Sequence, residues 1–297
     1  MNKVGIVGIG VMGMAILEKF IEENVQVDVC DVNPEAIEKA DKHGAEIVDN
    51  LENLPEEVKI ILFVLPGPDQ VKAVFSGLID NCSSKHVLVD LSTVDPATSK
   101  ENQMKAAEKG VGYLDAPILG RPHKCGNWTL PVGGHIENYT EVEDVLSVIA
   151  DKVLDMGEPG NGNALKLANN LMFGVINTVT SEIMALTEEL GMDPGLFYDT
   201  VANSGAATVS NLFVELGPKI VNRDFSAKFT VEHLHKDMRL GIEMARDAGM
   251  PLMVADVCQK MNEIALAKGL NKEDSSSVVK VYENFTEKLN AEAGNCS

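Results

Sequence analysis

Short apolar runs alternate with helical patterns through the first half of the chain. The runs at 60–65 and 87–91 show no regular alternation with polar residues, which is typical of parallel strands covered on both faces. Because strands and helices follow one another, the pattern predicts an α/β fold with a doubly wound parallel sheet. The expected strands are 3–7, 26–30, 60–65, 87–91, 111–114, 130–132 and 152–155, and the expected helices are 12–23, 33–44, 69–79 and 98–109.

The strand pattern stops after a glycine-rich stretch at 157–162. Residues 164–190 then predict a helix of about 27 residues, closed by Gly191, that is apolar around most of its circumference as far as Glu182. We expect its own domain or another subunit to bury such a helix. Further helices are expected at 194–202, 230–248, 252–268 and 276–289. The sequence therefore predicts two domains, 1–162 with the sheet and 163–297 built of helices alone.

A glycine motif with the spacing G-x-G-x-x-G joins the first expected strand to the first helix. In this motif the first glycine permits a tight turn, the second lets the backbone approach a pyrophosphate, and the third lets helix and strand pack closely. Asp31 directly follows the second expected strand, 18 residues beyond Gly13, where a carboxylate can bind ribose hydroxyls. No Arg or Lys occurs at 32–34 to receive a 2′-phosphate, so we predict NAD rather than NADP. The predicted cofactor residues of this turn are Gly8, Gly10, Val11, Met12, Gly13 and Asp31.

The charge and cysteine content narrow the class of protein. A net charge of −20 disfavours non-specific nucleic-acid binding and an anionic membrane surface, because both are negatively charged. The five cysteines are scattered and form no C-x-x-C pair, so neither a metal site nor a disulfide framework is expected. We predict a cytoplasmic protein with free thiols and a small-molecule substrate.

Six blocks, spread over nearly the whole chain, form a further pattern. They are Gly8–Gly13 with Met12, Leu65-Pro66, Asp90-Leu91-Ser92-Thr93 with Pro96, Asp115-Ala116-Pro117 with Val132-Gly133-Gly134, Gly160-x-Gly162-x-x-x-Lys166-x-x-Asn169-Asn170, and Lys236-Asp237. In these blocks the chain resembles the β-hydroxyacid dehydrogenase family, the group of 3-hydroxyisobutyrate dehydrogenase and glyoxylate/succinic semialdehyde reductase, related to 6-phosphogluconate dehydrogenase. The resemblance implies a Rossmann domain followed by an all-helical domain. It also implies reversible NAD(P)-linked oxidation of a 3-hydroxy acid, or reduction of an aldehyde or keto acid.

The resemblance also assigns catalytic roles. It makes Lys166 the acid/base, Asn170 its partner on the substrate, and Lys236 a residue near the nicotinamide. Lys166 and Asn170 are four residues apart and therefore share one helix face. Burial lowers the pKa of a lysine, which lets its amine accept the hydroxyl proton near neutral pH.

Residues after two expected strands complete the predicted site. Ser92 and Thr93 stand at the carboxyl end of a strand, where cofactor and substrate meet in open sheets, so Ser92 is expected on the substrate and Thr93 on the nicotinamide. Leu65, Pro66 and Gln70 are expected near the cofactor, with an ordinary surface role left open for Gln70.

The substrate loop departs from the family pattern D-A-P-V-S-G-G. Leu119 stands where a serine would bind the substrate carboxylate, and Arg121 stands where glycine is usual. Backbone N–H groups around Gly120 remain, and Arg121 is either a bidentate clamp for an anion or a solvent-facing residue. The single tryptophan, Trp128, is expected either to form a wall of the pocket or to pack under this loop, and we favour packing.

The leading interpretation is an NAD-dependent oxidoreductase for a small anionic 3-hydroxy acid or its aldehyde. A glyoxylate or succinic semialdehyde reductase of the same family, and a non-catalytic NAD(H)-binding regulatory protein, remain alternatives. An imine reductase is less favoured, because that branch commonly lacks the lysine found at Lys166. The long apolar helix also predicts a homodimer or homotetramer.

Overall fold

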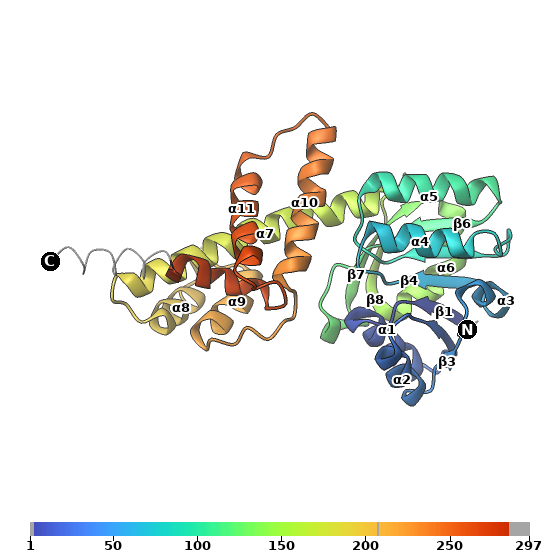
Figure 1. Ribbon diagram of the computed structural model, residues 1–297, viewed down its shortest axis with the longest axis horizontal. Helices are drawn as coiled ribbons and strands as arrows, with labels where there is room; N and C mark the ends of the chain where they lie inside the picture. The colour runs from blue at the N-terminus through green and yellow to red at the C-terminus, as the bar shows by residue number, and fades with distance from the viewer. Residues whose placement is uncertain (1–2, 207, 285–297) are drawn as a thin grey trace. The chain divides into compact units, whose positions relative to one another are not determined.

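The computed structural model describes residues 3–206 and 208–284 (Figure 1). Contacts between residues divide the chain into two compact units, Met1–Leu167 and Ala168–Ser297. The division falls inside one continuous helix, α7 (Asn161–Glu189). The domain boundary expected after residue 162 stays a prediction.

The first unit contains one eight-stranded sheet in the order β3-β2-β1-β4-β5-β6-β7-β8. Neighbouring strands are parallel except for β6 and β7, which are antiparallel. The doubly wound fold expected from the sequence is confirmed, with this one pair as the departure from a wholly parallel sheet. The strands are β1 (Val4–Val7), β2 (Val27–Cys30), β3 (Glu46–Ile47), β4 (Ile60–Phe63), β5 (Val87–Asp90), β6 (Gly112–Asp115), β7 (Trp128–Gly134) and β8 (Ala150–Asp155).

Helices cover both faces of the sheet, which explains its continuous apolar strands. In β4, Ile60 and Leu62 belong to one buried cluster, whereas Ile61 and Phe63 belong to a second one. The first cluster includes side chains of α1 and α6, and the second includes side chains of α4. The helices of this unit are α1 (Val11–Glu22), α2 (Pro34–Lys42), α3 (Leu54–Glu57), α4 (Pro68–Leu78), α5 (Pro96–Glu108) and α6 (Ile136–Ile149).

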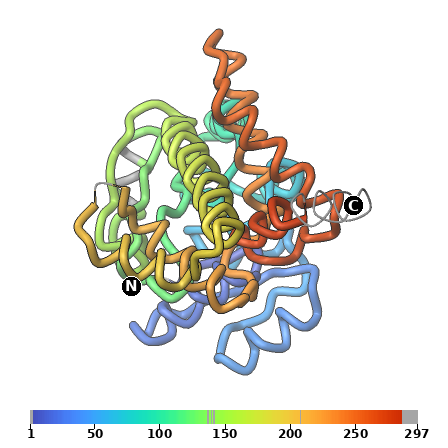
Figure 2. The backbone as a smooth tube through the Cα atoms, turned by 90° about the vertical axis from the view of Figure 1, so that its left-hand side faces the viewer, coloured from blue at the N-terminus to red at the C-terminus, as the bar shows by residue number. Residues whose placement is uncertain are grey.

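The described part of the second unit is helical. Its helices are the remainder of α7, α8 (Pro194–Asn203), α9 (Asn211–Val221), α10 (Val231–Asp247) and α11 (Met253–Ala267), followed by the 3₁₀ helix η3 (Ser275–Val278). Figure 2 shows the α8–α9 pair and the α10–α11 pair on either side of α7. α7 and α10 approach closely at Gly174. A Cβ at this position would lie 2.1 Å from Sδ of Met238, so a larger residue would not fit. None of the described helices is both long and apolar enough to cross a membrane.

Some elements differ from the sequence-based expectation. β3, α3, α6 and α9 were not expected: β3 and α3 are only two and four residues long, and α9 contains Pro218, which normally ends a helix. The segment expected as a helix at 276–289 begins instead with η3, and residues 285–289 lie outside the described residues.

A buried carboxylate joins the sheet to the start of α7. Asp115, at the end of β6, accepts hydrogen bonds from the backbone N–H groups of Gly160 at 2.7 Å and Asn163 at 2.8 Å. A Cβ on Gly162 would lie 2.4 Å from the Pro131 carbonyl oxygen, so only glycine allows this approach. Burial raises the pKa of Asp115 to about 7, against the lowering effect of the two backbone hydrogen bonds.

This titration predicts a pH dependence of stability. The folded-state pKa lies above the ordinary value of 3.8, so between about pH 4 and 7 the folded protein binds more protons here than the unfolded chain does. The Asp115 contribution to the free energy of unfolding therefore falls as pH rises through that window, by up to about 1.4 kcal/mol per pH unit. Urea unfolding of the wild type and Asp115→Asn between pH 5 and 8 measures it. Asp115→Asn should have a lower free energy of unfolding than the wild type, and that free energy should fall less steeply with rising pH. Equal slopes for the two proteins would contradict the raised pKa of Asp115.

Candidate active site

The glycine turn between β1 and α1 leaves space at the start of α1. Gly8 has a φ of +98°, and a Cβ there would lie 2.4 Å from the Val64 carbonyl oxygen. A Cβ on Gly13 would lie 2.1 Å from the Gly8 carbonyl oxygen, whereas a Cβ on Gly10 would meet nothing within 4 Å. Gly8 and Gly13 are therefore required by packing, and Gly10 faces open space. No side chain caps the α1 N-terminus, so its first-turn N–H groups suit an anion such as a pyrophosphate.

Asp31 lies beside this turn at the end of β2. Its carboxylate accepts the backbone N–H of Ile9 at 2.5 Å and that of Asn33 at 2.8 Å. These bonds hold the carboxylate against the glycine turn, where a ribose of a bound dinucleotide would lie. The next side chain, Val32, is fully exposed. Together the open glycine position, the uncapped helix and the carboxylate fit an NAD(P) molecule.

The carboxyl ends of β4 and β5 are tied together by a serine. Ser92 is buried, accepts the Leu65 N–H at 2.9 Å through its hydroxyl oxygen, and donates its own N–H to Asp90 at 2.9 Å. Thr93 is half-buried next to it. The structure thus brings Leu65, Ser92 and Thr93 to one edge, whereas Gln70 is exposed on the first turn of α4.

Lys166, one turn into α7, reaches the substrate loop. Its Nζ donates to the Ile118 carbonyl oxygen at 2.8 Å, and the side chain is half-buried. Asn163, on the first turn of the same helix, accepts the Val94 N–H at 3.0 Å, so α7 also holds the segment after β5. The amine therefore lies within unit 1 at the start of the loop that contains Leu119, Gly120 and Arg121.

Trp128 fixes the backbone of that loop from beneath. It is fully buried, and its Nε1–H donates to the Arg121 carbonyl oxygen at 2.8 Å. A Cβ on Gly120 would lie 2.1 Å from the indole ring, so only glycine fits. Leu119 and Thr129 exchange backbone hydrogen bonds of 3.0 and 3.2 Å. The packing role expected for Trp128 is confirmed.

In unit 2, Asp237 links Asn170 to Lys236. Asn170 donates to Asp237 at 2.5 Å through Nδ2, and its Oδ1 accepts from Asn169 at 3.0 Å. Lys236 forms an ion pair with the other Asp237 oxygen at 2.8 Å. Sequence reasoning included Asp237 only as part of a Lys-Asp motif and gave it no role. Its position identifies it as a residue that orients the Asn170 amide and holds the Lys236 amine.

Comparison with known proteins decides the family. Residues 3–157 match the family described as the NAD binding domain of 6-phosphogluconate dehydrogenase. Residues 160–282 match the family described as NAD-binding of NADP-dependent 3-hydroxyisobutyrate dehydrogenase. The chain belongs to the β-hydroxyacid dehydrogenase family. The resemblance drawn from the sequence motifs is thereby confirmed, and the chain is an NAD(P)-dependent hydroxyacid dehydrogenase.

Individual relatives of this dehydrogenase span nearly its whole length. The chain is 29% identical over 289 residues to 2-(hydroxymethyl)glutarate dehydrogenase of Eubacterium barkeri, covering 96% of each chain. It is 29% identical to L-threonate dehydrogenase of Cupriavidus necator, covering 95% of this chain and 96% of that one. A crystal structure of 3-hydroxyisobutyrate dehydrogenase from Salmonella typhimurium matches with a TM-score of 0.86 and 27% identity. The match covers 95% of this chain and 100% of that one.

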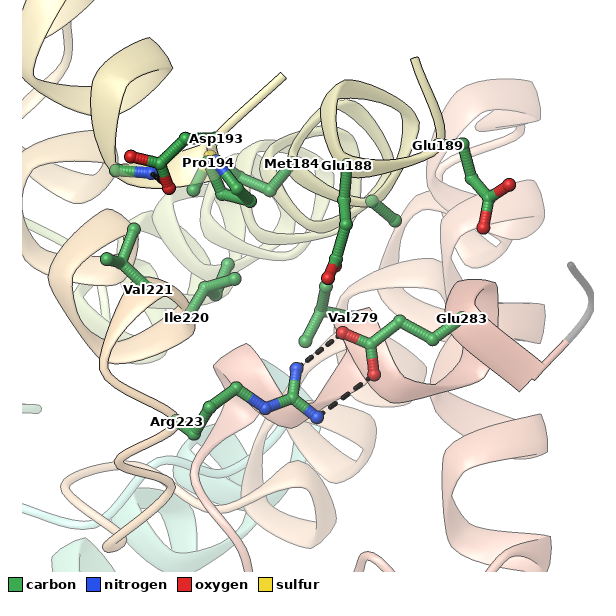
Figure 3. Close-up of a pocket in the computed structure, with 12 residues that line it drawn as sticks. Met184, Glu188, Glu189, Asp193, Pro194, Ile220, Val221, Arg223, Val279 and Glu283 are labelled. Atoms are coloured by element: carbon green, nitrogen blue, oxygen red, sulfur yellow. Dashed lines mark hydrogen bonds and ion pairs between the residues drawn. The ribbon is translucent and has the colours of Figure 1, made fainter. Parts of the chain in front are cut away.

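A cavity of about 480 Å³ in unit 2 of the dehydrogenase contains none of the expected site residues (Figure 3). Four carboxylates line it, from Glu188, Glu189, Asp193 and Glu283. The one basic lining residue, Arg223, is bound to Glu283 at 2.5 and 3.1 Å. An anionic substrate would be repelled by this cavity, so we do not assign it to the reaction.

Proposed function

We propose that the chain oxidises a small anionic 3-hydroxy acid, or reduces the corresponding aldehyde, with NAD as cofactor, as 3-hydroxyisobutyrate dehydrogenase does. The observation that supports this most is the Lys166 amine, held 2.8 Å from the Ile118 carbonyl oxygen at the start of the substrate loop. The relatives are named for different hydroxy acids. We therefore infer that the residues of this loop select which acid is bound.

In this proposal Lys166 moves the proton and Asn170 positions the reacting oxygen. NAD⁺, when bound, supplies the acceptor for the hydride. Lys166 in its neutral form accepts the hydroxyl proton, and in the reverse direction its ammonium returns the proton to the carbonyl oxygen. One Asn170 N–H is bound to Asp237, and the second N–H of that amide donates to the substrate oxygen.

Arg121 binds the anionic group of the substrate in this proposal. Leu119 has no hydroxyl to donate, so the loop supplies backbone N–H groups and the Arg121 guanidinium instead. A guanidinium donates two parallel hydrogen bonds to a carboxylate, which fixes orientation as well as charge.

The first prediction concerns cofactor choice. Asp31→Ser combined with Val32→Arg should raise the NADP/NAD ratio of kcat/KM by on the order of a hundredfold, because it removes a repelling carboxylate and adds a charged donor. Steady-state kinetics with both cofactors measures the ratio, with Val32→Arg alone as the control. A wild type that prefers NADPH would contradict the proposal.

The second prediction concerns the proton transfer. Lys166→Ala should lower kcat about a hundredfold or more, the scale of general acid–base assistance, while the dissociation constant for NAD stays unchanged. Lys59→Ala, an exposed lysine before β4, is the matched control and should retain full turnover. If Lys166→Ala turns over as fast as the wild type, the acid/base assignment is wrong.

The third prediction concerns the anion. Arg121→Ala should raise KM for the hydroxy acid, or abolish saturation, with little change in NAD binding. The KM of Arg121→Lys should lie between those of the wild type and Arg121→Ala, because lysine keeps the positive charge but lacks the planar guanidinium that donates two parallel hydrogen bonds. Lys124→Ala, an exposed cation on the same loop, tests general charge effects. Equal KM values for Arg121→Ala and the wild type would show that Arg121 does not bind the substrate anion.

A further inference from the structure

A row of aromatic side chains begins next to Asn170 in unit 2. Phe173 is three residues beyond Asn170 on α7, so the two side chains lie on the same side of the helix. The Phe173 ring meets the Phe229 ring edge-on, with centroids 5.4 Å apart. The Phe229 ring in turn stacks on the imidazole of His233, with centroids 6.1 Å apart and an angle of 24° between the planes. The row therefore connects α7 to the first turn of α10.

Charged and polar groups lead from this imidazole back to Asn170. His233 and Lys236 are three residues apart on α10 and share one side of that helix. Lys236 is paired with Asp237 at 2.8 Å, and Asp237 accepts the Asn170 amide at 2.5 Å. We call this closed set of side chains the α7–α10 cluster. It consists of Asn170, Phe173, Phe229, His233, Lys236 and Asp237.

Backbone contacts hold the stacked pair in place. The Phe229 carbonyl oxygen accepts the Ser275 N–H at 2.8 Å, and the Phe229 N–H donates to Asp274 at 3.4 Å. Thr230 caps α10, because its hydroxyl oxygen accepts the His233 N–H at 3.1 Å. His233 itself is exposed, and no group within 3–206 or 208–284 hydrogen-bonds to its ring nitrogens. The imidazole is thus fixed in position but available to a ligand.

The α7–α10 cluster offers hydrogen-bonding groups without an excess of charge. The Asp237 carboxylate balances the Lys236 ammonium. Partial burial lowers the pKa of His233 from its ordinary value of 6.5, and the Lys236 ammonium lowers it further, so the imidazole is mainly neutral at pH 7. A neutral imidazole has one N–H donor and one acceptor nitrogen. A hydroxyl group, which also donates and accepts, matches it better than a second carboxylate, which only accepts.

We propose that His233 selects acids with a second hydroxyl group, by hydrogen-bonding that hydroxyl while Asn170 holds the reacting oxygen. The inference rests on the function proposed above, because Asn170 brings the substrate to the α7–α10 cluster. Phe229 fixes the plane of the imidazole, and therefore the direction of its N–H and of its acceptor nitrogen. The nicotinamide ribose also carries hydroxyl groups, so a test has to separate the substrate from the cofactor.

Steady-state kinetics with two acids of nearly the same size tests the proposal. Glycerate has a hydroxyl group where 3-hydroxyisobutyrate has a methyl group, and both carry a primary hydroxyl for oxidation. The wild type should have the higher kcat/KM for glycerate. His233→Phe, which keeps the stack and loses both nitrogens, should lower that kcat/KM about tenfold through KM, the scale of one hydrogen bond. It should leave kcat/KM for 3-hydroxyisobutyrate and KM for NAD unchanged.

Two further variants separate this role from a structural one. His233→Gln keeps a donor and an acceptor and should recover part of the kcat/KM for glycerate. His43→Phe makes the same change at an exposed histidine that ends α2, and it should alter the kinetics of neither acid. An equal loss for both acids in His233→Phe would overturn the proposal. So would a rise in KM for NAD alone, which would assign His233 to the nicotinamide ribose.

The same measurements distinguish this inference from the proposed function. Oxidation of neither acid by the wild type would overturn the proposed function and this inference together. Oxidation of 3-hydroxyisobutyrate with a kcat/KM equal to or above that for glycerate would overturn this inference alone.

Discussion

The hydrogen bonds from the start of α7 to Asp115 are the constraint on which the candidate site depends. They fix the first turn of a 29-residue helix against β6, in a space where Gly133 and Gly162 admit no side chain. Lys166 is one turn beyond Asn163, so its position relative to the substrate loop follows from this attachment. The raised pKa of Asp115 shows that the attachment is held at an electrostatic cost, because two backbone donors only partly replace the water lost on burial.

The sequence predicts those parts of the fold and site that depend on short spacings. The glycine turn, the Asn33 cap of α2 and the β4 strand each follow from a few consecutive residues, and all are present. The reversed direction of β7 could not be predicted, since the apolar pattern of a strand is the same in either direction. Nor could the bond between Asn170 and Asp237, which are 67 residues apart. Contacts of that separation depend on how helices pack, for example through the close approach of α7 and α10 at Gly174.

The substrate loop shows how a fold can keep its backbone while its chemistry changes. Trp128 and Gly120 fix the path of the loop, and the bond from Trp128 ends on the Arg121 carbonyl rather than on a side chain. The side chains at 119 and 121 are therefore able to vary without loss of the turn. In our proposal, the missing hydroxyl at Leu119 and the guanidinium at Arg121 change how the substrate anion is bound, while Lys166 keeps its bond to the Ile118 carbonyl oxygen.

The buried side of α7 is both polar and apolar, because the helix forms hydrogen bonds there and also packs against its neighbours. Its inner side begins with Asn163 and Asn170, whose amides are needed for hydrogen bonds to the loop after β5 and to Asp237. Apolar residues of α7 also pack within unit 2: Leu171 packs against the buried cluster that contains Met238 of α10, and Met184 and Ala185 lie in a second buried cluster. Burial of these residues holds the helix in place while the amides make their hydrogen bonds.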